Sequence, residues 1–431
     1  MTLRDEVTQL LQELIRLDTV NPPGNETRAA EHLRGYLERN GVACELHARV
    51  PERANLVARL PGSGDGPSLC LVSHTDTVLA DPAEWQRDPW SGDLAGGEVW
   101  GRGALDMKGQ VAASAVAIAS LAREGFRPSG DLLFVAAADE EVGDGFGLEW
   151  LCAEHPDAVR CDLAVNEGAG DRLELGGRVV YLCAAAEKMS APFRLRVRGR
   201  SGHASQPGIA DNALVKAARL VERLGSYRPE PRLQPETEAF LRVVGAEIAD
   251  AEHALDAARR VSPAAAELVE PLLGPTLAPT MIAASEKRNV IPGICDVVVD
   301  CRLPPGESPA TFEPTIRALL GDTELELELE WLEAMGGTRS SFETSLWRAI
   351  EEFVAAEEPG ARLAPIVCPG FTDSHWLREA FGTVAYGFFP ARAMEQELAA
   401  RLIHSADERV PVDDLELGVR FLRAVARTVS G

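Results

Sequence analysis

The sequence predicts an α/β protein whose mostly parallel sheet is covered by helices and split by an inserted ferredoxin-like α+β domain. Two observations lead to this prediction. Short apolar runs alternate with helical runs in the first part of the chain and again from about residue 340, which is the pattern of a parallel sheet with helices on both faces. In the middle, the runs follow the order strand-helix-strand-strand-helix-strand, which is the ferredoxin-like arrangement.

The first part of the chain supplies helices and strands in alternation. Its helices are predicted over residues 4–17, 27–40, 108–124 and 147–154. Its strands, all of them short apolar runs, are predicted over residues 54–60, 68–74, 131–138 and 161–166. After residue 340, helices are expected at 345–356, near 373–381 and at 413–429, with a strand at 383–389. These segments form the expected α/β domain, which spans residues 1–190 and 336–431.

Residues 191–335 are expected to form the inserted domain. Its first strand, 193–200 (FRLRVRGR), alternates apolar and basic residues, as a strand with one face in water does. The segments that follow are predicted as a helix at 212–224, strands at 280–285 and 296–303, a helix at 309–320 and a strand at 324–331. A helix-rich insertion with proline at its borders interrupts this order at about 229–275.

The composition argues against several kinds of partner. The chain has 67 acidic against 43 basic residues and a formal charge of −24, so nucleic acid and anionic lipid would repel it. No signal peptide is apparent, and the longest apolar run, 111–122, is too short to cross a bilayer. The eight cysteines show no CxxC spacing, so we expect reduced thiols. We therefore expect a cytoplasmic protein that binds a small molecule, and neither nucleic acid nor a membrane.

Histidine and acidic residues stand at the ends of three predicted strands. His74 and Asp76 end one strand, Glu140 and Glu141 follow the next, and Glu167 follows the third. Ligands of open α/β sheets bind beyond the carboxyl ends of the strands, so we expect these side chains to meet at one edge. Each residue alone is more typical of a loop or cap, and the Glu140-Glu141 pair alone is more typical of a solvated acidic turn. Their occurrence at consecutive strand ends favours a site.

Asp106 adds another carboxylate, in the glycine-rich turn of GRGALDMKG just before a predicted helix. So many acids would repel one another unless cations neutralise them, and two divalent metal ions bridged by one carboxylate would do so. Imidazole and carboxylate ligands suit zinc, and manganese or cobalt fit the same donors. Asp76 can reach back to the His74 imidazole and fix its tautomer, so we place it among the catalytic residues.

Nine motifs in order carry a resemblance to a known family. They are SHTDTV, GRGALDMKG, DEEVG, NEG, SGHAS, RNVIPG, DCRLPPG, GFTDS and IHSADERV. The chain resembles, from about residue 5 to 429, the zinc metallopeptidase family that includes acetylornithine deacetylase, succinyl-diaminopimelate desuccinylase, aminoacylase and glutamate carboxypeptidase. The resemblance implies a catalytic α/β domain with two bound metal ions and an inserted lid domain.

The resemblance implies roles for the residues at matching positions. The metal ligands that it implies are His74 and Glu167 on the first ion, Glu141 and His404 on the second, and Asp106 on both. It implies that Glu140 is the general base, which activates a water molecule between the ions. It also implies a cis peptide bond between Asp106 and Met107.

Residues of the lid domain receive roles in the same way. His203 of SGHAS matches a histidine that, in dimeric members, reaches the partner's active site and helps to stabilise the oxyanion. Asn289 of RNVIPG is similar to a residue that works beside that histidine. Arg288 and Arg302 are candidates for binding the substrate carboxylate, because a planar guanidinium holds carboxylate through two bonds. Thr372 of GFTDS lies on the loop that borders the substrate. His203 indicates a homodimer through the lid, whereas the insertion at 229–275 could instead cover the site within one chain.

We therefore expect a hydrolase that uses two metal ions to cleave an amide bond, peptide or N-acyl, in a small substrate with a free carboxylate. An enzyme of the aminoacylase or deacetylase type and one of the carboxypeptidase or dipeptidase type share this catalytic core, so the sequence leaves both open. The alternative from another class is a catalytically inactive, metal-dependent binding protein of the same fold. That alternative requires a missing ligand or base, and all of these positions are filled.

Overall fold

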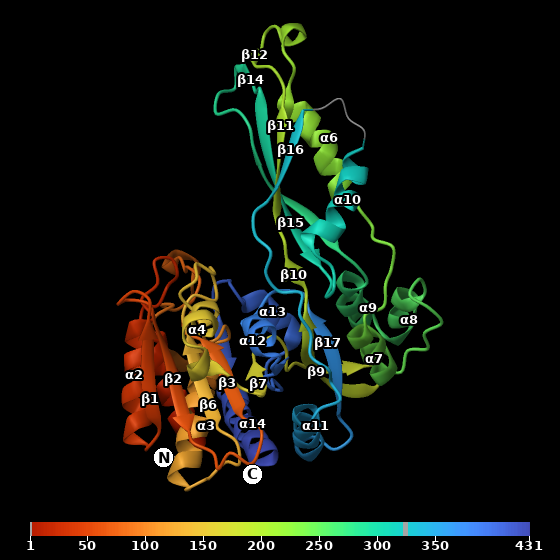
Figure 1. The fold of residues 1–431 in the computed structure, drawn as a ribbon. Helices are drawn as coiled ribbons and strands as arrows, with labels where there is room; N and C mark the ends of the chain where they lie inside the picture. Colours follow the sequence, from red (N-terminus) through yellow and green to blue (C-terminus); the bar gives the residue numbers. More distant parts are fainter. Residues whose placement is uncertain (1, 322–325) are drawn as a thin grey trace. The chain divides into compact units, whose positions relative to one another are not determined.

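The computed structural model describes residues 2–321 and 326–431 (Figure 1). The chain separates into two compact units. Unit 1 comprises Met1–Ala185, Ser340–Ile366 and Thr372–Gly431, and unit 2 comprises Ala186–Arg339 and Val367–Phe371. Each unit has its own hydrophobic core.

Unit 1 is built on a nine-stranded sheet. Its strands, in spatial order, are β1 (Ala43–Ala48), β2 (Ala54–Leu60), β6 (Leu132–Ala137), β3 (Leu69–His74), β7 (Leu163–Asn166), β18 (Val384–Gly387), β9 (Arg178–Glu187) and β17 (Arg362–Cys368), with β8 (Arg172–Leu175) paired to β9. The central strands β6, β3, β7 and β18 run parallel, whereas β1, β2, β8 and β9 pair antiparallel with their neighbours. The predicted α/β class with a parallel sheet is confirmed, and its parallel part is the centre.

The register of the central strands brings their carboxyl ends to one edge of the sheet. His74, the last residue of β3, is the register partner of Ala137, the last residue of β6. Asn166, the last residue of β7, is in the same way the partner of Gly387 in β18. The loops that follow these strands therefore start from a common edge.

Successive residues of the central strands enter different cores, because side chains alternate between the faces of a sheet. Leu69 and Leu71 of β3 belong to one apolar cluster, which also contains residues of the helices α1 (Leu3–Ile15), α2 (Thr27–Arg39), α3 (Lys108–Arg123), α11 (Ser345–Glu357) and α14 (Val412–Ser430). Cys70 and Val72 belong to another, with residues of α4 (Leu148–Glu154), α5 (Pro156–Val159) and α12 (Ser374–Phe381). Helices therefore cover both faces, as expected.

Helix α3 is buried on all sides from Lys108 to Leu121, as its alanine-rich, all-round apolar sequence requires. The Lys108 ammonium group donates to the backbone oxygens of Leu14 and Leu17 at 3.0 and 2.9 Å, which fastens the start of α3 to the end of α1. A separate three-stranded sheet joins β4 (Asp93–Ala95) and β5 (Glu98–Trp100) to β19 (Arg409–Pro411), and helix α13 (Gln396–Leu402) precedes β19. The described residues contain no disulfide bond.

Unit 2 has the predicted ferredoxin-like arrangement. Its sheet has the order β13 (Thr276–Ala283), β15 (Ile294–Leu303), β11 (Phe193–Arg198) and β16 (Leu327–Trp331), with a short β10 (Met189–Ser190) also on β15. Helices α6 (Ala213–Gly225) and α10 (Pro309–Leu320) complete the pattern and supply part of its core. The first two residues predicted for the last strand, 324 and 325, lie outside the described residues.

Residues 229–275 carry α7 (Pro235–Val244), α8 (Ala254–Val261) and α9 (Pro263–Val269). The buried Lys188 fastens the end of this segment within unit 2, because its ammonium group donates to the backbone oxygens of Pro271 and Gly274 at 2.9 and 3.0 Å. Burial lowers the pKa of Lys188 to about 8. Strands β12 (Gly202–His203) and β14 (Val290–Ile291) form a further small pair in unit 2. A membrane-spanning helix is not found in the described part of the chain.

Candidate metal centre

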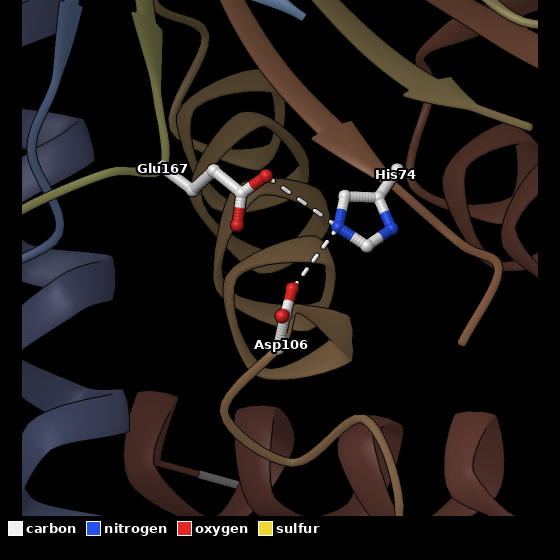
Figure 2. Close-up of side chains that lie close together, drawn as sticks. All are labelled: His74, Asp106 and Glu167. Atoms are coloured by element: carbon white, nitrogen blue, oxygen red, sulfur yellow. Dashed lines mark hydrogen bonds and ion pairs between the residues drawn. The ribbon is translucent and has the colours of Figure 1, made fainter. Parts of the chain in front are cut away.

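His74 and two carboxylates form a first group of donors at the edge where the central strands end (Figure 2). The His74 Nε2 atom lies 3.1 Å from Asp106 Oδ1 and 3.5 Å from Glu167 Oε1. His74 ends β3, Glu167 directly follows β7, and Asp106 lies in the turn before α3. Three separate segments therefore direct one imidazole and two carboxylates at a common point.

Asp106 belongs to a second group through its other oxygen atom. The His404 Nε2 atom lies 3.1 Å from Asp106 Oδ2 and 3.1 Å from Glu141 Oε2. In each group, one ligand atom from each residue lies within 4.8 Å of the others. The two donor triads, His74–Asp106–Glu167 and Asp106–Glu141–His404, thus share one carboxylate. The peptide bond between Asp106 and Met107 is cis, as the resemblance implied.

The electrostatics of the triads favour added positive charge. Burial opposes protonation of His74, yet the carboxylates of Glu167 and Asp106 raise its pKa well above the ordinary value. Hydrogen bonds with Asp106 and Glu141 raise the pKa of His404 to about 10. Burial raises the pKa of Glu167, so negative charge is costly there without a cation. Both imidazoles lie where a positive charge is stabilised.

The donors fit divalent metal ions. Glu141 Oε1 is buried and has no hydrogen-bond partner among the described residues, which is the state of an acceptor that a cation would satisfy. Each triad offers imidazole nitrogen and carboxylate oxygen, the donors that zinc binds and that manganese and cobalt also accept. Two ions would share Asp106 and neutralise most of the surrounding acid.

Asp76 fixes the orientation of the His74 ring through contacts with its Nδ1 atom. The His74 Nδ1 atom lies 3.1 Å from the backbone oxygen of Asp76 and 3.4 Å from its Oδ1, so the Nδ1–H donates away from the triad and Nε2 is the ring nitrogen that faces it. The same carboxylate accepts the backbone N–H groups of Glu140 and Glu141 at 3.2 and 3.1 Å. Asp76 therefore links His74 on β3 to the turn that follows β6.

Glu140 lies beside the first triad without belonging to it. Its Oε2 atom is 3.9 Å from His74 Nε2, and its side chain is 11% exposed. Burial raises its pKa well above the ordinary value, and the carboxylates of Glu167, Asp373 and Asp106 act in the same direction. A nearby carboxylate that is not itself a ligand and that holds a proton readily has the properties of a general base.

A buried ion network supports the turn that carries Glu140, and sequence reasoning missed it. The Arg53 guanidinium donates to both oxygens of Glu26 at 2.7 Å and to Asp139 Oδ1 at 3.0 Å. Asn21 Nδ2 donates to Asp76 at 2.9 Å and to Asp139 at 3.1 Å. The only signal in the sequence is the turn-forming segment VNPPGNE, which contains Asn21 and Glu26.

The predicted lid residues and Thr372 lie as follows. His203 is exposed on β12, and its Nδ1 atom accepts the backbone N–H of Ser205 at 3.2 Å. Asn289 is close to it, because its backbone oxygen accepts the N–H of Ala204 at 3.0 Å. Arg288 is exposed, whereas the Arg302 guanidinium is held by both oxygens of Asp300 at 2.9 and 3.0 Å. Thr372 belongs to unit 1, where it is buried two residues before α12.

The fold and the paired donor triads are those of a metal-dependent hydrolase. The chain belongs to peptidase family M20/M25/M40, whose sequence model matches residues 70–428. The resemblance seen in the motifs is thereby confirmed, and with it a hydrolase that acts on amide bonds.

Named relatives of similar length support this assignment. The chain is 29% identical over 431 residues to succinyl-diaminopimelate desuccinylase of Methylobacterium sp. (strain 4-46), with 96% of this chain and 94% of the relative covered. It is 28% identical over 422 residues to the desuccinylase of Cereibacter sphaeroides, with 94% of each covered. Among solved structures, it is similar in fold to an M20 family metallo-carboxypeptidase of Sulfolobus solfataricus, with a TM-score of 0.76, 17% identity and 99% of both chains covered. Human carnosine dipeptidase 1 gives a TM-score of 0.70 at 16% identity, with 98% of this chain and 96% of that chain covered.

Proposed function

We propose that the chain is a hydrolase with two divalent metal ions that removes an acyl group from the nitrogen of a small substrate carrying a free carboxylate. The single observation that carries this proposal is the sharing of Asp106 by two donor triads with Glu140 beside them. The names of the desuccinylase relatives support an N-acyl substrate.

His74, Asp106 and Glu167 would hold one ion, and Asp106, Glu141 and His404 the other. Zinc is the ion that we propose, because both triads combine imidazole with carboxylate. When bound, the ions supply Lewis acidity, which polarises the amide carbonyl and lowers the pKa of a water molecule to about 7.

Glu140 is the residue that we propose to move the proton. Its carboxylate takes a proton from the attacking water and returns it to the leaving nitrogen. Asp76 keeps this carboxylate in place, because it accepts the backbone N–H groups of both Glu140 and Glu141. The same Asp76 holds His74 in the tautomer whose Nε2 faces the triad.

His203 is suited to donate a hydrogen bond to a developing oxyanion. A backbone N–H can only donate, so the contact from Ser205 makes His203 Nδ1 an acceptor and places the ring proton on Nε2. We propose that Asn289 works beside it and that Thr372 borders the substrate. Arg288, which is exposed, is the better candidate for the substrate carboxylate, because Asp300 already occupies the Arg302 fork.

The replacement Glu140→Gln tests the proposed base. It removes the proton acceptor and keeps the ligands, so turnover should fall by about 10²- to 10⁴-fold while metal content stays at the wild-type level. Glu149→Gln, an exposed glutamate on α4, is the matched control and should retain full activity. Substrates for this assay are succinyl-, acetyl- and formyl-amino acids beside di- and tripeptides. A Glu140→Gln protein with wild-type rates would remove Glu140 from this role.

The same panel separates the remaining alternatives. Cleavage of the peptides in preference to the N-acyl amino acids would indicate an exopeptidase. A wild-type protein that binds two ions and cleaves no member of the panel would instead support a metal-dependent binding protein.

Exposed apolar side chains on two adjacent elements of unit 2 favour a homodimer as a second feature of the proposal. Strand β13 is at the edge of its sheet, and its Met281 and Ile282 are 67% and 52% exposed. Leu214 and Val215 of α6, which packs against β13, are 39% and 51% exposed. Water contact with these apolar side chains is unfavourable, and a second copy of the chain that packs against this edge would cover part of them. Ile282→Glu should convert a dimer to a monomer in light scattering; an unchanged mass would place the interface elsewhere.

A further inference from the structure

Glu408 is a fully buried acid for which the proposed mechanism has no use. It lies four residues after His404, in the motif IHSADERV, and its relative exposure is 0%. A carboxylate in such a place is stable only when its oxygen atoms are well supplied with hydrogen bonds. The donors that surround Glu408 indicate what it does.

Four donors reach the Glu408 carboxylate, and all come from the turn that precedes α3. Its Oε1 atom accepts the backbone N–H groups of Leu105 and Asp106 at 2.7 and 3.0 Å. Its Oε2 atom accepts the backbone N–H of Gly103 at 3.0 Å and the Arg102 guanidinium at 2.7 Å. One side chain therefore fixes the backbone from residue 102 to the shared ligand Asp106.

Arg102, the charged donor to Glu408, makes two further contacts. Its guanidinium also donates to the backbone oxygen of Leu79 at 3.2 Å and lies over the Trp85 ring at 5.3 Å from the centroid. The ion pair with Glu408 is thus enclosed by the loop that follows β3. The buried contact between Arg102 and Glu408 thus joins the motifs GRGALDMKG and IHSADERV, which are about 300 residues apart in the sequence.

The segment around Glu408 is fastened along its length to the same region. The backbone oxygen of Glu408 accepts the N–H of Gly101 at 2.9 Å, and β19 continues this contact by pairing with β5. The Asp407 side chain accepts the backbone and side-chain N–H groups of Gln86, both at 2.8 Å. His404 and Asp407 have φ values of 59° and 63°, a conformation that non-glycine residues adopt only when their surroundings hold them there.

The two triads depend on this contact to different degrees. His74 ends a central strand and its side chain is 1% exposed, so the sheet itself fixes it. The His404 side chain is 51% exposed and comes from a turn between α13 and β19. Glu408 links that turn to Asp106, so the geometry of the Asp106–Glu141–His404 triad rests on it.

We infer that Glu408 is a positioning residue that creates the second metal site by fixing the position of His404 relative to Asp106. This inference rests on the proposed binding of two ions. It predicts that loss of the Glu408 contact weakens the second ion far more than the first and leaves a protein with one tightly bound ion.

The replacement Glu408→Gln tests this, because its amide nitrogen would face donors where a carboxylate oxygen now accepts them. Metal-depleted protein is titrated with Zn²⁺ by calorimetry and with Co²⁺ by visible absorption. We expect the second binding step to weaken by about 10- to 100-fold, as is usual when a group that orients a ligand is lost, and the first by much less. Glu98→Gln is the matched control, because Glu98 pairs with Arg409 at 3.1 Å on the same small sheet and should leave both steps unchanged.

Arg102→Leu provides a second variant, which keeps Glu408 and its three bonds from backbone N–H groups. It should weaken the second step by less than Glu408→Gln does. Equal weakening of both steps, or two unchanged steps in folded Glu408→Gln, would overturn the positioning role. A wild-type protein that binds a single ion would instead overturn the proposed function, so the two failures are distinguishable.

Discussion

Arg53→Met should destabilise unit 1 by about 3–5 kcal/mol, the usual cost of removing one partner of a buried ion pair. Arg53, Glu26 and Asp139 are 5%, 0% and 3% exposed. In the variant both oxygens of Glu26 lose their guanidinium donor, and Asp139 loses one of its donors. The upper half of the range is expected, because one substitution leaves two buried carboxylates poorly paired. Urea unfolding followed by far-UV circular dichroism, with the metal ions held in fixed excess, measures this loss.

Arg59→Met is the matched control for this experiment. Arg59 lies on β2 and pairs with Asp131, but its side chain is 33% exposed, so its loss should cost about 0–1 kcal/mol. Adding Glu26→Leu to Arg53→Met should restore part of the stability, because the two partners of the ion pair are then removed together. Equal and small losses from Arg53→Met and Arg59→Met would refute the reasoning from burial.

Two further predictions follow from the charges of the buried groups. Burial lowers the pKa of Lys188 to about 8 from 10.5, so the native state holds fewer protons between these values, and the free energy of unfolding should rise with pH across this window by about 3 kcal/mol. Lys188→Met should abolish that rise in urea unfolding at pH 8 and 10.5; a slope kept in the variant contradicts the assignment. Removal of metal by a chelator should lower the midpoint temperature of thermal unfolding. Addition of zinc at about 1,000 times its Kd should then raise the free energy of unfolding by about 4 kcal/mol. A midpoint temperature that stays the same after addition of chelator or zinc would contradict the binding of stabilising metal ions by the triads.

The strands that carry the site could be predicted because they are fully buried. Strands β3, β6 and β7 are continuous apolar runs, and the ends of these runs are sufficient to place His74, Glu140 and Glu167 at one edge of the sheet. Burial on both faces removes the need for polar residues within a strand, so the sequence signal is strong.

Strands outside the parallel centre of the sheet gave weaker signals and were missed. β1 (ACELHA) is mostly exposed or half-buried, so it lacks an apolar run. β17 (RLAPIVC) contains a proline, which argues against a strand and is tolerated here because β17 is at the end of the sheet order. The second half of β9 is rich in alanine, which favours helix, and its sheet neighbours override that preference.

The residues of the site and of its supporting network also include some that no sequence pattern could place. His404 comes from a turn with φ above zero, so no strand or helix pattern could place it, and only the resemblance of IHSADERV to a family motif did. The Arg53 network joins segments that are far apart in sequence, and its charges look like surface residues until the fold buries them. Pairing through space leaves no periodic trace in a single sequence.

Under the proposed binding of two ions, the sharing of Asp106 also limits how a one-ion descendant of this protein arises. Its two oxygen atoms face different imidazoles, so every replacement at position 106 damages both triads at once. A lineage that loses one of the two proposed ions therefore retains this aspartate and changes a residue that serves the other site alone, either a ligand or a positioning residue such as Glu408. Position 404 tolerates such a substitution best, because its half-exposed side chain can be exchanged without repacking the interior. The side chain of Glu141, in contrast, is only 5% exposed.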